Sequence, residues 1–289
     1  MKNPETVLHL LKEESPYMMS FVIITREDRA IVIDGGRPED MPALKACLGG
    51  RQIAAWILTH AHNDHISGFI DEYKKNRCQD FDIEQLVYCF PPYLEWAARV
   101  DVPAPEYFKR DLDEMLPAFT EIEGELADIA YIPKEGESLT VDECRIDFLF
   151  TYRNELVSNP VNDASLVFKV TAPHTSILFL GDLGPEGGDI LYEESRHLLS
   201  ADIVQMAHHG HMGVGMEVYA AIAPKACLWC CPEWLYNEPE IPTYLEDRSR
   251  LFRMRRGRMY GVAVTRGWMQ ALGVEAHYVS CYGPHEIKL

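Results

Sequence analysis

The stretch LTHAHNDHIS, Leu58–Ser67, carries three histidines and an aspartate within six residues: His60, His62, Asp64 and His65. Neutral imidazole and carboxylate are preferred ligands of zinc and similar divalent ions. A His-x-His pair at the end of a strand can direct two imidazoles at one ion, while Asp64 and His65, beyond a turn, can face another. The stretch therefore predicts a site for two metal ions, about 3.5–4 Å apart as in two-metal hydrolases. Two ions need more ligands than these four residues provide.

Further ligand candidates follow two other apolar runs. Asp182 follows the run 176–180 after one glycine, Gly181, and its carboxylate could bridge both ions. The run 202–206 leads into AHHGH, which contains His208, His209 and His211. Each residue also has a simpler explanation, because an Asp after a strand is often a turn former or helix cap and a lone buried histidine is often structural. Their clustering at strand ends favours the metal site.

The hydrophobic pattern indicates many strands with helices between them. Strands are predicted at 20–25, 30–34, 54–60, 86–90, 129–133 and 145–150, then as a hairpin of 165–172 with 176–182, and at 201–206 and 225–231. Residues 93–127 show helical spacing and predict a helical insertion, and 188–199 predicts a further helix. We expect a single α/β domain over residues 1–289.

Composition limits the possible function. Apolar residues make up 47% of the chain and charged residues 25%, both typical of globular proteins. The net charge of −18 argues against a nucleic-acid footprint over the whole surface and against contact with anionic membranes. No apolar run reaches the roughly 18 residues of a membrane span, and the N-terminal segment lacks the order of a signal peptide. The eight scattered cysteines predict reduced thiols in a cytoplasmic protein, and Cys227, Cys230 and Cys231 are expected to pack in the core.

One basic segment departs from the acidic composition. Residues 248–258, within a predicted Arg-rich segment at 240–260, hold six arginines. Arginine forks match phosphate geometry, so the segment could guide a phosphate-rich ligand or nucleic acid. A solvated helix face that pairs with the many carboxylates of the chain is the alternative.

The motifs resemble those of the metallo-β-lactamase fold superfamily. THAHNDH (59–65) matches its H-x-H-x-D-H signature, ILFLGD (177–182) resembles its bridging-aspartate motif, and DIVQMAHHG (202–210) resembles its last metal-histidine motif. The resemblance covers Ser20 to Pro232 and implies a four-layer αβ/βα sandwich. The segments NDASLVFKV, FLGD and AHHGH are also similar to the hydrolase domain of bacterial DNA-uptake (competence) channel proteins and to choline-phosphate esterases. Both groups are associated with phosphodiester chemistry.

The resemblance also implies a ligand set. It assigns His60 and His62 to metal 1, Asp64 and His65 to metal 2, Asp182 to a bridging position, and His209, or alternatively His208, to the last ligand position. Many superfamily hydrolases have a further metal-1 histidine, which this chain lacks. Asn162 or Asp163 could fill that position with an oxygen, since His174 falls in a predicted hairpin turn.

These residues predict a metal-dependent hydrolase that uses a hydroxide bridging two divalent ions on a phosphodiester, small or nucleotide-type. Zinc is the expected metal, with manganese or iron as alternatives because an added oxygen ligand suits harder ions. Asp64 could orient the hydroxide, and His208 or His211 could donate a proton to the leaving oxygen. The alternatives are a lactone or other ester hydrolase, and a non-catalytic metal-containing protein that binds nucleic acid or a partner.

Overall fold

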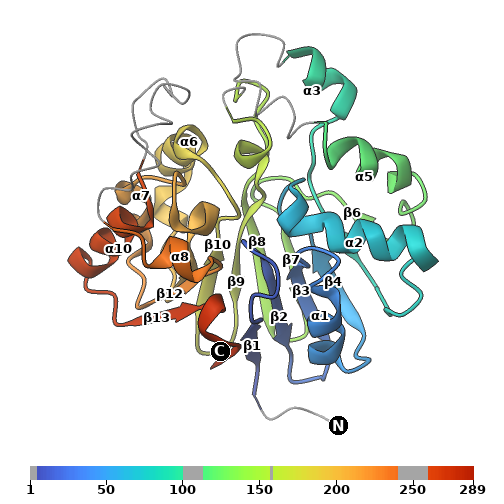
Figure 1. Ribbon diagram of the computed structural model, residues 1–289, viewed down its shortest axis with the longest axis horizontal. Helices are drawn as coiled ribbons and strands as arrows, with labels where there is room; N and C mark the ends of the chain where they lie inside the picture. Colours follow the sequence, from blue (N-terminus) through green and yellow to red (C-terminus); the bar gives the residue numbers. More distant parts are fainter. Residues whose placement is uncertain (1–4, 100–112, 157–158, 240–259) are drawn as a thin grey trace.

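Two mixed β-sheets face each other in the computed structural model, which describes residues 5–99, 113–156, 159–239 and 260–289. Helices cover the outer surface of each sheet, α1, α2 and α5 on one side and α6, α7 and α10 on the other (Figure 1). This layering confirms the predicted αβ/βα sandwich. None of the helices in the described ranges is long and apolar enough to cross a membrane.

The first sheet has the order β14-β1-β2-β3-β4-β5-β6. Its strands are β1 Val7–Leu10, β2 Ser20–Ile24, β3 Ala30–Asp34, β4 Ile53–Ile57, β5 Leu86–Val87, β6 Ala130–Tyr131 and β14 His285–Lys288. Strands β3 to β6 run parallel, and the remaining neighbours pair antiparallel. All residues of β2, β3 and β4 are buried, as expected for strands covered on both faces.

The second sheet has the order β13-β12-β11-β10-β9-β8-β7. Its strands are β7 Ser138–Val141, β8 Cys144–Phe150, β9 Val167–Thr171, β10 Ser176–Phe179, β11 Ile203–Gln205, β12 Ala226–Trp229 and β13 Ala276–Val279. The hairpin predicted around His174 is present as the antiparallel pair β9–β10, and His174 is exposed in its turn. Strands β10 to β13 run parallel.

The helices connect the parallel strands of both sheets. They are α1 Met41–Leu48, α2 Asn63–Asn76, α3 Tyr93–Arg99, α5 Leu116–Glu123, α6 Pro185–Ser195, α7 Met216–Ile222, α8 Glu233–Tyr236 and α10 Val262–Ala271, with short 3-10 turns η1 Asn162–Ala164, η2 Arg196–Leu198, η3 Ala207–Gly210 and η4 Ser280–Tyr282. Helices α3 and α5 belong to the predicted insertion, whose residues 100–112 lie outside the described ranges. The Arg-rich segment at 240–260 also lies outside the described ranges, apart from its last residue, Tyr260.

Alternating side chains of the strands fill two different cores. On β2, Phe21 and Ile23 point into the layer between the sheets, where the Phe21 ring meets Phe179 edge to face at 5.2 Å. Val22 and Ile24 point outward against α1 and α2. This period of two is what a strand requires when both of its faces are buried.

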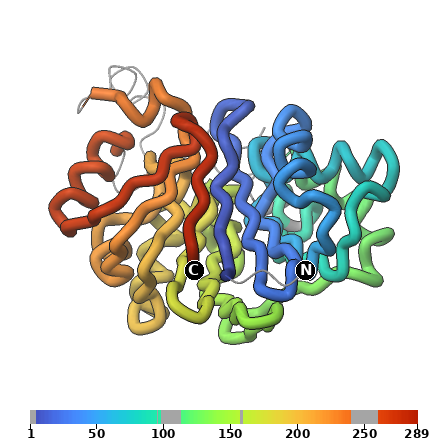
Figure 2. Tube along the Cα trace, turned by 90° about the horizontal axis from the view of Figure 1, so that it is seen from below, coloured from blue at the N-terminus to red at the C-terminus, as the bar shows by residue number. Residues whose placement is uncertain are grey.

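The first and last described strands lie side by side. Strand β1 pairs antiparallel with β14, with Val7 opposite Lys288, and Figure 2 shows the C-terminal segment in red beside the N-terminal strands in blue. The sequence pattern missed β1, because a four-residue run such as VLHL is too short to show strand periodicity. The first sheet is therefore completed by a strand from the opposite end of the sequence.

Candidate metal centre

The first group of candidate ligands lies where β4 leads into α2. His60 follows β4 and is fully buried, and His62 occupies the N-cap position of α2 with extended backbone angles. Asp64 and His65 lie in the first turn of that helix. The rigid strand and the helix start thus fix four donor groups at the carboxyl edge of the sheet, where α/β folds usually place their sites.

The second sheet supplies two more donors to the same point. Asp182 follows β10 and His209 follows β11, and both are buried. Asp182 Oδ2 lies 3.7 Å from His60 Nε2 and 3.2 Å from His209 Nε2, while Asp182 Oδ1 lies 3.4 Å from His65 Nε2. His209 Nε2 also lies 3.2 Å from Asp64 Oδ2. The Asp182 carboxylate therefore lies between residues of both halves of the chain.

Two groups of donors are close enough to hold metal ions. One is His60, His65 and Asp182, and the other is Asp64, His65 and His209. His62 adjoins the first group, since its Nδ1 lies 3.1 Å from His60 Nε2. The structure thus brings together all six residues predicted as main ligands: His60, His62, Asp64, His65, Asp182 and His209.

The charges of this cluster fit divalent cations. Burial alone would lower the pKa of His65 and His209, but Asp182 with Asp34 raises the first well above its usual range and Asp182 with Asp64 raises the second to about 10. The carboxylates therefore stabilise positive charge at this point. The Asp182 Oδ1 and His65 Nε2 atoms are buried without a hydrogen-bond partner among the described residues. A bound cation would supply the charge and a partner for both atoms.

Asp34 orients two of the candidate imidazoles from behind. It is fully buried at the end of β3, and it accepts hydrogen bonds from Thr59 N (2.7 Å), Thr59 Oγ1 (2.7 Å) and His65 Nδ1 (2.8 Å). Because the Thr59 hydroxyl donates to Asp34, it accepts from His60 Nδ1 at 3.1 Å. In their neutral form, both histidines therefore present Nε2 as a lone-pair donor, an arrangement common for metal-binding histidines. The sequence reasoning missed this role of Asp34.

A left-handed turn carries His209 into the cluster. His208, His209 and Gly210 all have positive φ angles, of 50°, 57° and 91°. His209 Nδ1 donates to the carbonyl of Cys230 at 2.7 Å, so its Nε2 faces the carboxylates. Backbone strain of this kind is concentrated at functional sites.

The other predicted residues lie beside the cluster or away from it. Asp163 Oδ1 accepts from Gly184 N at 3.1 Å, near the start of α6, and Asp163 belongs to neither group of donors among the described residues, so its role as a ligand stays a prediction. The preceding residue, Asn162, is the one near the site, with its Nδ2 3.4 Å from His208 Nε2. His208 Nε2 lies 4.0 Å from Asp182 Oδ2, and the His211 ring stacks on the His208 ring at 4.5 Å.

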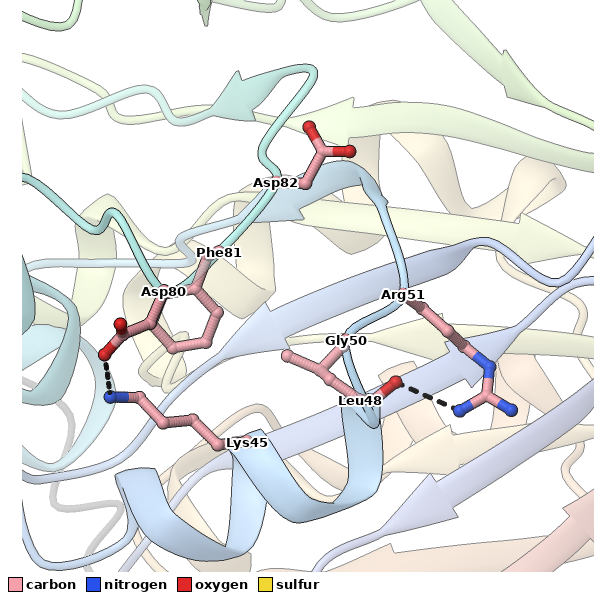
Figure 3. A pocket seen from close by; sticks show the side chains of 7 residues that line it. All are labelled: Lys45, Leu48, Gly50, Arg51, Asp80, Phe81 and Asp82. Carbon is pink, nitrogen blue, oxygen red and sulfur yellow. Dashed lines mark hydrogen bonds and ion pairs between the residues drawn. The ribbon is translucent and has the colours of Figure 1, made fainter.

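A small surface pocket lies at the end of the first sheet that is opposite to the cluster of candidate ligands (Figure 3). It is lined by Lys45, Leu48, Gly50, Arg51, Asp80, Phe81 and Asp82. Arg51 precedes β4, whereas the metal-binding cluster follows that strand, and the five residues of β4 span about 16 Å. Both cationic side chains of the pocket already have partners. Lys45 forms ion pairs with Glu72 and Asp80, and Arg51 forms one with Asp28. This pocket is therefore separate from the cluster and its basic groups are neutralised.

Comparison with known families decides the assignment. The model of the metallo-beta-lactamase superfamily matches residues 17–216, which include every ligand candidate of the cluster. The chain belongs to this superfamily. Membership places it among metal-dependent hydrolases, in agreement with the donor groups described above.

Solved structures share the fold of this chain at low sequence identity. The metallo-beta-lactamase fold protein YhfI from Bacillus subtilis is 12% identical with a TM-score of 0.54, over 99% of this chain and all of that protein. CmlA, a diiron β-hydroxylase from Streptomyces venezuelae, is 10% identical with a TM-score of 0.55, over 99% of this chain but 55% of its own length. No curated protein sequence matches the chain significantly. At such identities the similarity extends to the fold alone.

Proposed function

We propose that the protein hydrolyses phosphodiesters with two divalent metal ions. His60, His62 and Asp182 would hold the first ion, and Asp64, His65 and His209 the second, with Asp182 shared. Zinc suits this set of imidazoles and carboxylates. The buried Oδ1 of Asn162 has no hydrogen-bond partner among the described residues and would add an oxygen donor, so manganese or iron is the alternative.

The proposal depends mainly on three polar side chains that lie beside the candidate ligands and are not themselves among the donor groups. His208 lies 4.0 Å from Asp182, Asn162 and His211 lie against His208, and none of the three belongs to either group of three donors. A phosphodiester has two non-bridging oxygens and a leaving oxygen, and each of them needs a hydrogen-bond or proton donor. Imidazole and amide groups supply such donors without the mutual repulsion of further cations.

The roles of the side chains follow from their positions. Bound divalent ions would supply Lewis acidity and make hydroxide available near neutral pH. Asp64 would orient the attacking water, because its carboxylate faces the same space as that of Asp182. His208 would hydrogen-bond the phosphoryl group beside the leaving oxygen, and the Asn162 amide, 3.4 Å from His208 Nε2, would hold the His208 ring in place. The stacked ring of His211 would limit rotation of His208.

Two further observations support the proposed substrate class and a cytoplasmic location. The segments NDASLVFKV, FLGD and AHHGH are similar to the hydrolase domain of DNA-uptake channel proteins and to choline-phosphate esterases, which are associated with phosphodiester chemistry. All eight cysteines are free, and free thiols favour the reducing environment of the cytoplasm. Nucleic-acid contact through 248–258 stays a prediction, because that segment lies outside the described residues.

The test is metal content together with hydrolysis of bis(p-nitrophenyl) phosphate, on wild type and Asp182→Asn. We expect two metals per chain in wild type and a loss of activity of about 100-fold or more in the variant, since a shared ligand affects both ions. Asp202→Asn is the matched control, because Asp202 precedes β11 at the opposite edge of the sheet and binds Ser176 and Lys225.

Each other outcome would contradict the proposal in a different way. Bound metal without phosphodiester turnover, but with hydrolysis of p-nitrophenyl acetate or a lactone, would favour the ester-hydrolase alternative. Absence of metal binding under all loading conditions would favour the non-catalytic binding protein.

A further inference from the structure

Tyr17 lies directly against the candidate metal ligands. Its half-buried ring meets the His209 ring edge to face at 5.1 Å, and it lies 6.0 Å from the His211 ring. Tyr17 has a φ of 67°, in the left-handed region that a bulky residue rarely adopts. Such a conformation persists only where the surrounding contacts hold it.

Those contacts are present on both sides of Tyr17. The Ser15 backbone N–H and hydroxyl donate to the buried carboxylate of Asp40, at 2.8 and 2.5 Å, and the Arg37 guanidinium donates to the Pro16 carbonyl. Beyond Tyr17, Met19 N donates to the carbonyl of Asp64 at 3.1 Å, which joins this loop to a candidate ligand. The backbone on both sides of Tyr17 is therefore held in place, and the Tyr17 ring lies against His209 without any bound ligand.

The Trp234 ring packs against the Tyr17 ring at nearly a right angle. The two ring centroids are 5.8 Å apart, with the ring planes at 85° to each other. Trp234 is 58% exposed, which is unusual for so large an apolar side chain, although its helix α8 is anchored by buried Leu235 and by the packing of Tyr236 on Trp229. An exposed indole on an anchored helix, next to a fixed phenol ring, provides a preformed aromatic surface.

We propose that Tyr17 and Trp234 form a stacking subsite for a planar ring of the substrate. This inference rests on the proposed phosphodiester hydrolysis and narrows the substrate to a phosphodiester that carries a planar group, such as a nucleobase. The Trp234 face would stack on the ring, and the perpendicular Tyr17 ring would contact its edge. Stacking is tolerant of base identity, because every base has a π-face. The subsite therefore selects for a planar ring and not for one base.

The test is calorimetric binding of adenosine 5′-monophosphate and ribose 5-phosphate to the metal-loaded protein. The two compounds share the phosphorylated sugar, and the second carries a hydroxyl group in place of the base. We expect the adenosine compound to bind about fivefold or more tightly, the lower range for one stacked base. Trp234→Leu should remove this preference while leaving the affinity for ribose 5-phosphate unchanged. Trp234→Phe should restore part of the preference, because it restores an aromatic face.

Tyr282→Leu is the matched control, since Tyr282 is 54% exposed and close to the same helix, where Asn237 donates to its hydroxyl. It should keep the preference. Equal affinity for the two compounds in wild type, failure of adenosine 5′-monophosphate to bind, or equal loss of both affinities in Trp234→Leu would overturn the inference. Hydrolysis of bis(p-nitrophenyl) phosphate is measured separately. A preserved base preference without turnover would refute the phosphodiesterase activity and retain the stacking subsite.

Discussion

Replacing Asp34 by asparagine should weaken metal binding, although Asp34 is not itself a candidate metal ligand. Asp34 accepts three hydrogen bonds, and the one from His65 Nδ1, at 2.8 Å, keeps the His65 proton away from Nε2. An asparagine of the same shape can still accept from Thr59 N. Its amide group, however, would donate toward His65 Nδ1, which favours the tautomer that carries its proton on Nε2. That tautomer cannot bind a metal through Nε2.

The expected size follows from the role of such orienting groups. Loss of a group that orients a metal ligand typically costs about 10- to 100-fold in metal affinity, or about 1.4–2.7 kcal/mol. The free energy of unfolding of the metal-free protein should fall by about 1–3 kcal/mol, because a hydrogen bond to a buried charged group is lost. Competition with a chromophoric chelator measures the metal affinity, and urea unfolding measures the stability.

A matched variant separates orientation from general damage. Asp142 is another largely buried carboxylate, and it accepts from Thr25 and Arg29 in the turn between β7 and β8. Asp142→Asn should lower stability and leave metal affinity unchanged. If Asp34→Asn bound metal as tightly as wild type, within about twofold, the proposed role of Asp34 would be wrong.

Two further predictions concern the backbone and the charge of the cluster. Gly210→Ala should lower the free energy of unfolding by about 2 kcal/mol or more, measured in urea, because φ is 91° and the new Cβ would lie 2.5 Å from Trp229 Cζ3. Gly273→Ala, with φ 74° and open space around it, should cost about 1 kcal/mol. The pKa of His209 is about 10 in the metal-free protein, because Asp182 and Asp64 outweigh the effect of burial. Stabilisation by its proton should be complete below about pH 6.5 and be lost as the pH rises toward 10, which thermal melts of chelator-treated protein at both ends of this range would show. Metal affinity should instead rise over the same range, since binding displaces that proton.

The sequence was sufficient for the layered fold and for the grouping of the main candidate ligands. The His60–His65 stretch and the apolar runs before Asp182 and His209 each carry their own local signal, so their meeting at strand ends could be predicted. Asp34 carries no such signal. It is one aspartate before two glycines, and its function depends on a partner in another element.

Neighbouring residues were harder to distinguish than distant ones. Asn162 and Asp163 are adjacent in the turn η1, yet Asn162 lies by His208 while Asp163 binds the start of α6. The direction of each side chain is set by backbone angles that residue type alone does not determine. The Tyr17–Trp234 contact was missed for a different reason, because it joins two segments without a shared motif and far apart in the sequence.

The pairing of β1 with β14 has a consequence for folding during synthesis. A ribosome releases β1 and β2 early, and these two strands can pair at once, since β2 follows within a short loop. The other edge of β1 must wait for β14, which emerges only after all the other strands of both sheets. Throughout elongation, the nascent first sheet therefore presents an unpaired strand edge, the feature by which growing chains most readily associate with one another.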